Sequence, residues 1–277
     1  MAADHRDLTV PTTRTPHQTG SAHPMEFSDK VVFVTAAAGA GIGQAVARTF
    51  AREGAKVVIS DQHAGRTESV AADIAKDTGA DVTGVPLDVR DESRIDEVMN
   101  GVVEQHGRLD IVVNNSGINM LAPLHEMPTE TWQTVLDVTL TGPFLVTRRA
   151  LNIMRAQGTG GAIVNMSSIA GWMRTAEGEA HYASAKAGIM GFTRAAAMEA
   201  APHGIRVNAV APGLAWNPFL GKIYGDEYVD EMARQTPLGR VGQPQDIANA
   251  VAFLAGEKAG FITGEVLCVS GGYHLHT

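Results

Sequence analysis

Apolar runs of strand length alternate along this chain with longer stretches of helical periodicity. The apolar runs span residues 30–35, 56–60, 81–87, 109–115, 161–167, 205–211 and 265–272. Within each run the residues are continuously apolar rather than alternating with polar ones, which is typical of strands buried on both faces of a parallel sheet. Helical periodicity covers residues 42–53, 64–78, 91–106, 130–155, 181–201 and 244–255.

The alternation predicts repeated β-α-β units and therefore an α/β domain. We expect a single Rossmann-like, doubly wound, seven-stranded parallel sheet with helices on both faces, spanning residues 25–277. Residues 1–24 are rich in Pro, Thr, His and Gly and are predicted to form a disordered N-terminal arm. Such sheets bind ligands beyond the carboxyl ends of their strands, so the residues that follow each strand are the candidates for function.

Charge and composition narrow the classes of partner. The 277 residues carry a formal net charge of −8, whereas a nucleic-acid-binding protein should present a basic stripe. No apolar run reaches the length of a membrane-spanning helix, roughly 18 residues, so neither nucleic acid nor membrane is expected as a partner. The single cysteine, Cys268, cannot form an internal disulfide and fits a cytoplasmic location. His274 and His276 lack a supporting cysteine or carboxylate cluster, so no metal is expected.

The stretch "VFVTAAAGAGIGQAVARTF", residues 32–50, begins as a strand and ends as a helix. Between them lie Gly39, Gly41, Ile42 and Gly43, and glycines there permit a tight turn and close backbone approach to a pyrophosphate at the helix N-terminus. The pattern alone is a weak signal, because a turn of small residues also lets a helix pack closely on a strand.

An acidic residue follows at the spacing that a dinucleotide site requires. Asp61 closes the second strand eighteen residues beyond Gly43, where a carboxylate accepts the adenosine ribose hydroxyls and repels a ribose phosphate. The next residues, Gln62 and His63, offer no fixed positive charge, so NAD is predicted in preference to NADP. Alternatively, Asp61 only caps the following helix.

Two further strand ends face the same predicted site. Asp88 follows the third strand, where its carboxylate could accept from the adenine amino group, with Val89 against the ring. Asn114 and Asn115 close the fourth strand, where side-chain amides either tie strands together or contact the ribose. Each of these residues alone fits a structural role, and their common placement favours the cofactor.

The candidate chemistry follows the fifth strand. Ser167 and Ser168 end that strand, and fourteen residues after Ser168 come Tyr182 and Lys186, spaced i and i+4 so that both lie on one helix face. A phenol is a poor acid or base at neutral pH, because its pKa is about 10, and a neighbouring cation lowers that pKa. A serine hydroxyl beside the phenol can hold a carbonyl or alkoxide oxygen.

Taken together, these motifs resemble the short-chain dehydrogenase/reductase family from about residue 27 to residue 273. The likeness rests on the glycine turn and on "LDV", "NNSG", "SS…YASAKAG", "RVNAVAPG" and "ITGEVLCVSGG". It implies an enzyme that moves hydride between a nicotinamide and a secondary alcohol or ketone. By this resemblance Tyr182 is the general acid/base, Ser168 positions the substrate oxygen, Lys186 and Tyr182 contact the cofactor, and Gly213 and Ala215 pass beside the nicotinamide.

Two departures from the family pattern bear on function. The glycine turn is one residue longer than usual, and Ala36 replaces its first glycine. Alanine disfavours positive φ, so we expect the turn to follow a different path and still to work. Thr139 stands where the family often has an asparagine of a proton relay, so a hydroxyl would carry that role.

Two tryptophans lie on loops near the predicted substrate-binding site. Trp172 and Trp216 lie on segments that would cover the nicotinamide, the second on a mobile lid expected at 214–236, and they predict an apolar pocket for a bulky ketone or secondary alcohol. Either could instead fill an oligomer contact. The long turn, "VLDVTLT" and "GW…HYASAKAG" resemble a subgroup that acts on steroid-ring or alicyclic acyl-CoA intermediates. The family resemblance also implies a homotetramer assembled through helices 130–155 and 181–201.

Two other functions remain open at this point. The chain could be an NADPH-dependent 3-oxoacyl-thioester reductase of fatty-acid type, which NADPH preference and straight-chain substrates would favour. It could also be a catalytically silent dinucleotide-binding module, given Thr139 and the altered turn. Tight NADH binding without turnover would favour that second reading.

Overall fold

A computed structural model describes residues 25–277 apart from 174, 176–177, 217 and 276–277, and it describes no side chain within 217–226. The arm predicted at residues 1–24 lies outside the described residues. The packed core already includes Phe27, which is 3% exposed and meets the Phe50 ring edge-on at a centroid distance of 4.7 Å.

Seven strands form one sheet, in which every neighbouring pair is parallel. The strands are β1 (Val31–Val34), β2 (Lys56–Asp61), β3 (Val82–Pro86), β4 (Ile111–Asn114), β5 (Gly161–Met166), β6 (Ile205–Pro212) and β7 (Val266–Val269). Their order is β3-β2-β1-β4-β5-β6-β7, so the direction of winding reverses between β1 and β4. This confirms the predicted doubly wound sheet and places its switch point beside the glycine turn.

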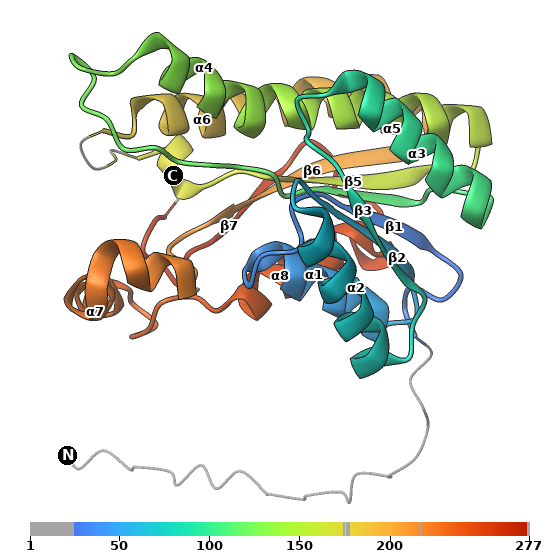
Figure 1. The fold of residues 1–277 in the computed structure, drawn as a ribbon, viewed down its shortest axis with the longest axis horizontal. Coiled ribbons are helices and arrows are strands. Elements are labelled where there is room, and N and C mark those ends of the chain that lie inside the picture. Colours follow the sequence, from blue (N-terminus) through green and yellow to red (C-terminus); the bar gives the residue numbers. More distant parts are fainter. Residues whose placement is uncertain (1–24, 174, 176–177, 217, 276–277) are drawn as a thin grey trace, which may run out of the picture.

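Helices cover both faces of the sheet (Figure 1). They are α1 (Ile42–Arg52), α2 (Ala64–Thr78), α3 (Glu92–His106), α4 (Thr129–Leu136), α5 (Gly142–Gln157), α6 (Ala180–Ala200), α7 (Pro218–Gln235) and α8 (Pro244–Ala255), with short helices η1 (Asp137–Thr141), η2 (Ile169–Gly171), η3 (Ala201–His203) and η4 (Glu257–Ala259). Figure 1 shows α1, α2 and α8 on one face and α3 to α6 on the other, with α7 beyond the sheet edge.

Successive residues of the central strand belong to different cores. In β1, Val32 and Val34 join the cluster under α1, α2 and α8, whereas Val31 and Phe33 join the cluster under α3, α5 and α6. All four side chains are at most 1% exposed. Burial on both faces is the physical reason why the strands read as unbroken apolar runs.

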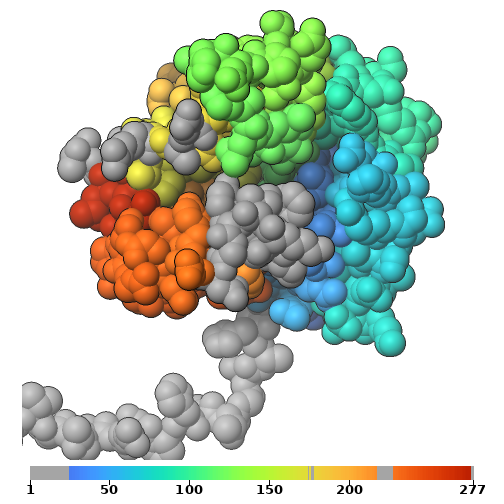
Figure 2. Space-filling view, turned by 60° about the vertical axis from the view of Figure 1, so that its left-hand side comes forward, coloured from blue at the N-terminus to red at the C-terminus, as the bar shows by residue number. Residues whose placement is uncertain are grey.

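Two helices differ from their predictions. The helix expected at 130–155 contains a π-helical segment, η1, between α4 and α5, and such segments are frequent at functional sites. The segment 214–236, expected as a lid loop, contains helix α7. Figure 2 views the molecule from the side on which α7 lies, where segments far apart in the chain, coloured blue, green, yellow, orange and red, gather on one face.

Candidate functional site

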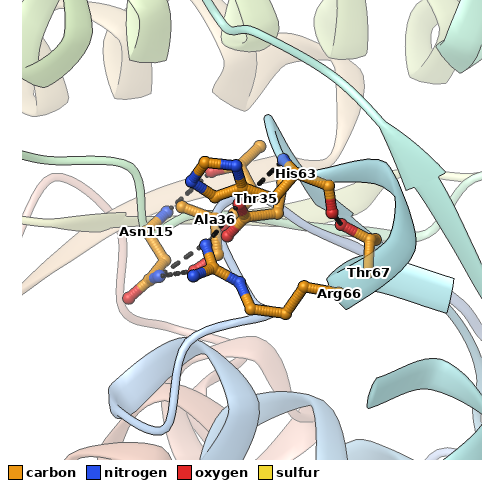
Figure 3. Close-up of polar contacts among 7 residues, drawn as sticks. Thr35, Ala36, His63, Arg66, Thr67 and Asn115 are labelled. Atoms are coloured by element: carbon orange, nitrogen blue, oxygen red, sulfur yellow. Dashed lines mark hydrogen bonds and ion pairs between the residues drawn. The ribbon is translucent and has the colours of Figure 1, made fainter. Parts of the chain in front are cut away.

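The turn after β1 contains a residue in the left-handed region of the backbone. Ala36 has a φ of 51°, so the prediction that alanine would steer the turn away from positive φ is wrong. Asn115 holds this conformation, because its Nδ2 donates to the carbonyl oxygens of Thr35 and Ala36 at 3.1 and 3.0 Å (Figure 3). In return, Thr35 Oγ1 accepts the backbone N–H of Asn115 at 3.0 Å.

The glycines of the turn have two different roles. A Cβ on Gly43 would lie 2.5 Å from Asn115 Nδ2 and 2.9 Å from the carbonyl oxygen of Ala36, so this glycine lets α1 pack against the strand ends. A Cβ on Gly39 or Gly41 would meet nothing within 4 Å. Open space above these two glycines fits the close approach of a pyrophosphate.

The N-terminus of α1 offers unpaired backbone donors to that space. Gly41 is the N-cap residue, and no side chain caps the helix. The first N–H groups of a helix lack intrahelical partners and carry its positive dipole end, which favours an anion. Ile42 begins the helix directly behind the open glycines. The residues of this turn therefore fit the diphosphate of a dinucleotide.

Asp61 lies where the ribose-binding carboxylate was predicted, and it has a cationic partner. It is 8% exposed at the end of β2, and its Oδ1 accepts the backbone N–H of His63 at 3.2 Å. The same oxygen accepts from Nη2 of Arg66 at 2.9 Å. Arg66 lies in the first turn of α2 (Figure 3) and was missed by the sequence analysis, which considered only the two residues that follow Asp61.

Asp88 is engaged by its own neighbour. Its carboxylate accepts from Nε of Arg90 at 3.0 Å and from the backbone N–H of the same residue at 3.0 Å, and this hydrogen bonding lowers the pKa of Asp88. Val89 is 6% exposed, and a Cβ on Gly142 of α5 would lie 2.6 Å from Val89 Cγ2. Both residues follow β3 as predicted, and their contact with an adenine stays a prediction.

Asn114 belongs to a buried polar network rather than to the surface of the site. Its Nδ2 donates to Thr147 Oγ1 and to Asn165 Oδ1, both at 2.8 Å. Asn165 in turn donates to Thr193 Oγ1 at 3.0 Å. The network ties β4 and β5 to α5 and α6.

Tyr182 and Lys186 face each other on α6, at the spacing predicted from sequence. Lys186 Nζ lies 5.5 Å from the centroid of the Tyr182 ring and donates to the carbonyl oxygen of Met166 at 2.7 Å. Lys186 is 3% exposed, and burial lowers its pKa to about 8. A Cβ on Gly117 would lie 3.2 Å from the ammonium nitrogen, so the loop after β4 approaches the cation closely.

The two serines after β5 make different contacts. Ser167 is 2% exposed, and its hydroxyl donates to the carbonyl oxygen of Lys186 at 2.8 Å, which fastens the end of β5 to α6. Ser168 has extended backbone at the start of η2, and its Oγ accepts the N–H of Ala170 at 3.2 Å. A serine Oγ that accepts one hydrogen bond keeps its own proton for a second acceptor.

His181, just before Tyr182, connects α6 to the loop after β4. The side chain is fully buried, and Nε2 lies 2.7 Å from the carbonyl oxygen of Met120. Because a carbonyl only accepts, Nε2 carries the proton, and Nδ1 is free to accept the backbone N–H of Tyr182 at 2.8 Å. The same loop is also held by Asn119, whose Nδ2 donates to Glu179 Oε1 at 2.8 Å.

Thr139 lies within the π-helical segment η1 and is fully buried. Its hydroxyl accepts the backbone N–H of Ile118 at 3.2 Å and lies 3.3 Å from the carbonyl oxygen of the same residue. These contacts fix the loop after β4. Its part in a proton relay stays a prediction.

The segment after β6 lies beside the end of β7. A Cβ on Gly213 would come within 3.0 Å of Ser270, so the two chains approach closely there. Ala215 forms an isolated bridge with Gly242, and the backbone N–H of Trp216 donates to the carbonyl oxygen of Gly242 at 2.8 Å. Trp216 is thus held at the start of the segment that leads into α7.

Trp172 stacks on a residue from the other end of the chain. Its ring lies 5.3 Å from that of His274, with an interplanar angle of 19°. Trp172 follows η2 directly, so the C-terminal segment borders the loop that carries Ser168. The partnership has no local sequence signal, because the two residues are 102 positions apart.

The described part of the chain shows neither a metal-binding cluster nor a membrane-spanning helix. No three His, Cys, Asp or Glu side chains gather as a metal site would require. Among the helices described, none has the length and apolar character needed to cross a membrane.

Comparison with known proteins relates the chain to oxidoreductases. A family model described as Enoyl-(Acyl carrier protein) reductase matches residues 36–274. A solved short-chain type dehydrogenase/reductase from Mycobacterium marinum superposes with a TM-score of 0.86 at 31% identity, covering 91% of this chain and 98% of that one.

Three relatives differ in the substrates that their names give. A (5R,7aS)-5-hydroxy-7a-methyl-1-oxo-2,3,5,6,7,7a-hexahydro-1H-indene-carboxyl-CoA reductase of Mycobacterium tuberculosis is 44% identical, covering 87% of this chain and 92% of that protein. A cis-4-hydroxycyclohexanecarboxylate dehydrogenase of Sinomonas cyclohexanicum is 43% identical, covering 89% and 97%. A 3-oxoacyl-[acyl-carrier-protein] reductase of Thermotoga maritima is 39% identical, covering 90% and 99%.

Proposed function

The chain belongs to the short-chain dehydrogenase/reductase family, and from this premise we propose that it is an NAD(H)-dependent enzyme for a ring-bearing secondary alcohol or ketone. Membership makes it an oxidoreductase that acts on CH–OH or keto groups with a nicotinamide cofactor. The proposal adds the form of the cofactor, the class of substrate and the residues that do the chemistry.

The cofactor half of the site is built from three features of this chain. The open glycines Gly39 and Gly41 would accommodate the pyrophosphate at the N-terminus of α1. Asp61, nearly buried at the end of β2, would accept the adenosine ribose hydroxyls. A carboxylate at that place disfavours the extra phosphate of NADP, which supports NAD(H). Asp88, Val89 and the segment of Gly213 and Ala215 complete the proposed contacts.

The observation that carries the catalytic proposal is the buried Lys186 beside Tyr182. A cation held 5.5 Å from the phenol ring stabilises the phenolate, so Tyr182 can take a proton at neutral pH. The nicotinamide, when bound, supplies or accepts the hydride. In oxidation the Tyr182 phenolate would remove the hydroxyl proton while Ser168 Oγ holds the substrate oxygen. In reduction the phenol would return that proton to the ketone oxygen.

The proposed substrate class rests on two tryptophans and on the names of two relatives. Trp172 directly follows η2, and Trp216 lies between β6 and α7. Flat aromatic surfaces suit a bulky ring. Two of the relatives carry a fused-ring or cyclohexane acid in their names, one of them as a CoA thioester. We extend that class to this chain. A homotetramer formed through α4, α5 and α6 and a cytoplasmic location are part of the same proposal.

NADH oxidation with three sets of ketones tests this function. The sets are alicyclic or fused-ring CoA thioesters, the same ketones as free acids, and straight-chain 3-oxoacyl thioesters. We expect turnover with the ring compounds and faster turnover with NADH than with NADPH. Turnover confined to straight chains with NADPH would instead identify a reductase of fatty-acid type. NADH binding without turnover of any ketone would favour the silent binding module.

A further inference from the structure

The imidazole ring of His274 is held in a fixed place near the C-terminus. It stacks on the Trp172 ring at a centroid distance of 5.3 Å and an interplanar angle of 19°. The backbone N–H of His274 donates to Ser270 Oγ at 3.2 Å, and that hydroxyl donates back to the carbonyl oxygen of His274 at 3.2 Å. The stack fixes the plane of the ring, and the two hydrogen bonds fix the backbone that carries it.

One nitrogen of this ring has no hydrogen-bond partner. Nε2 of His274 is buried, although the residue as a whole is only half-buried, and nothing in the described part of the chain bonds to it. A buried polar atom without a partner costs free energy, and most such atoms in folded proteins are satisfied. A ligand that brings a hydrogen-bonding atom to Nε2 would recover that cost.

His274 lies between two segments that border the proposed reaction centre. On one side it contacts Trp172, which directly follows η2, the short helix that Ser168 caps. On the other side a Cβ on Gly213 would lie 3.0 Å from Ser270, the residue that holds the His274 backbone. Figure 2 shows the C-terminal segment, in red, beside α7, in orange. The ring therefore borders the space into which a substrate held by Ser168 would extend.

We propose that His274 is a specificity-determining residue whose Nε2 donates a hydrogen bond to an acyl oxygen carried by the ring of the substrate. This inference rests on the proposed function and deepens it. Tyr182 and Ser168 serve the oxygen that reacts, so a second polar group on the same ring requires a partner of its own. The names of two relatives contain an acyl group, as a CoA thioester or a carboxylate, on a ring that also bears a hydroxyl.

An imidazole matches both forms of acyl group. The oxygens of a carboxylate and of a thioester carbonyl only accept, and the neutral tautomer with its proton on Nε2 supplies the donor. A fixed cation would favour the free acid, because its charge has a counterpart only there. A neutral donor therefore fits a site that accepts the ring ketone as either acid or thioester.

NADH oxidation with three ketones tests the inference. They are 4-oxocyclohexanecarboxylate, its CoA thioester, and 4-methylcyclohexanone, which lacks the acyl group. The measured quantity is kcat/KM for each acyl ketone divided by that for 4-methylcyclohexanone, and we expect the wild type to favour the acyl ketones. His274→Phe keeps a flat ring against Trp172 and removes Nε2, so this ratio should fall about tenfold. The loss should appear in KM, because Tyr182 is untouched.

Two further variants separate the nitrogen from the segment that carries it. His274→Gln gives up the stack and keeps an N–H donor near the place of Nε2, so it should restore most of the ratio. Tyr273→Phe is the matched control. Its hydroxyl donates to Gln235 Oε1 at 3.4 Å, so its loss disturbs the same segment without touching Nε2. The ratio should stay that of the wild type in this control.

Thermal unfolding distinguishes this role from packing. Since Nε2 has no partner in the described residues, His274→Phe should not lower the melting temperature. A lower melting temperature with an unchanged ratio would assign the ring to packing and overturn the inference.

The kinetic outcomes also separate this inference from the function on which it rests. A fall confined to one acyl ketone would support the inference and show which acyl form Nε2 binds. An unchanged ratio in folded His274→Phe would overturn the inference while the NAD(H) function stands. A folded wild type that binds NADH and reduces none of the ketones would overturn both.

Discussion

The ring of His181 accepts the backbone N–H of Tyr182 at 2.8 Å, from inside the first turn of the helix that both residues share. Glu179, the N-cap residue of α6, makes no side-chain cap hydrogen bond, and the N–H of Tyr182 has no partner four residues back within the helix. His181 provides the missing acceptor. Its other nitrogen holds Met120, so the proposed acid/base residue is anchored at a helix end that would otherwise fray.

Substitution of His181 should therefore affect turnover beyond its effect on stability. His181→Phe leaves a buried N–H and a buried carbonyl unpaired, which should cost about 1–3 kcal/mol in the free energy of unfolding. His181→Asn can still accept from Tyr182 and should retain most of kcat, whereas His181→Phe should lose about tenfold or more. Equal kcat in the two variants would mean that the ring only fills space. Urea unfolding and steady-state kinetics give both quantities.

Two substitutions in the glycine turn should have different effects, one on the free energy of unfolding and one on NADH affinity. Gly43→Ala forces a Cβ against backbone atoms of Ala36 and Ala37 at 2.9 Å, which should cost about 1–3 kcal/mol. Gly41→Ala, at a φ of −140° and with open space around the new methyl, should leave the free energy of unfolding nearly unchanged. It should nevertheless weaken NADH, because the methyl enters the space proposed for the pyrophosphate. Unaltered NADH affinity in Gly41→Ala would contradict that placement.

Ala36→Gly should stabilise the protein. The φ of 51° strains an alanine, and glycine relieves roughly 1 kcal/mol at such a position. Ala38→Gly is the control, because Ala38 is 3% exposed and is not among the residues with positive φ. The control should lower the melting temperature. A lower melting temperature in Ala36→Gly as well would show that the turn is not strained.

Lys186→Met should raise the free energy of unfolding and lower turnover. Burial disfavours the ammonium, so methionine should raise the free energy of unfolding at pH 7 by about 2 kcal/mol, after the loss of the bond to Met166. Turnover should fall about 100-fold or more, because the phenolate loses its cation. A variant less stable than the wild type at pH 7 would contradict the first part.

The difference in stability between Lys186→Met and the wild type should also depend on pH. The pKa of Lys186 is about 8 in the folded protein and 10.5 in its ordinary state. Below pH 8 the ammonium is charged in both the folded and the unfolded chain, so the penalty is complete. Between about pH 8 and 10.5 the unfolded chain binds more protons, so the wild type gains stability as the pH rises. The advantage of the methionine variant should shrink across that window.

The seven strands and the common helix face of Tyr182 and Lys186 could be predicted from the sequence, because the signals for both are local. Continuous apolar runs predicted all seven strands, and the spacing of Tyr182 and Lys186 predicted their common helix face. In each case the residues that decide the structure lie within a few positions of one another. For Gly43 the sequence left two roles open, close approach to a pyrophosphate and close packing of the helix on the strand, and the structure shows the packing.

The remaining features depend on contacts between distant segments. The left-handed backbone of Ala36 is held by Asn115, which is 79 positions away. The acceptor role of His181 follows from its contact with Met120, on a different loop. Arg66 reaches Asp61 only because α2 begins so soon after β2. The segment 214–236, expected as a mobile lid, contains helix α7 although the helix includes two glycines, at 221 and 225.

Comparison of Tyr182→Phe with the wild type is the sharpest test of the proposed acid/base role of Tyr182. Both proteins would be titrated with NADH by fluorescence and assayed for NADH oxidation with a ring ketone that the wild type reduces. We expect NADH Kd values within about threefold of each other and a loss of turnover of about 1,000-fold, because phenylalanine keeps the ring but lacks the hydroxyl proton that tyrosine transfers. Substantial residual turnover in a folded, NADH-binding Tyr182→Phe variant would contradict the proposed role.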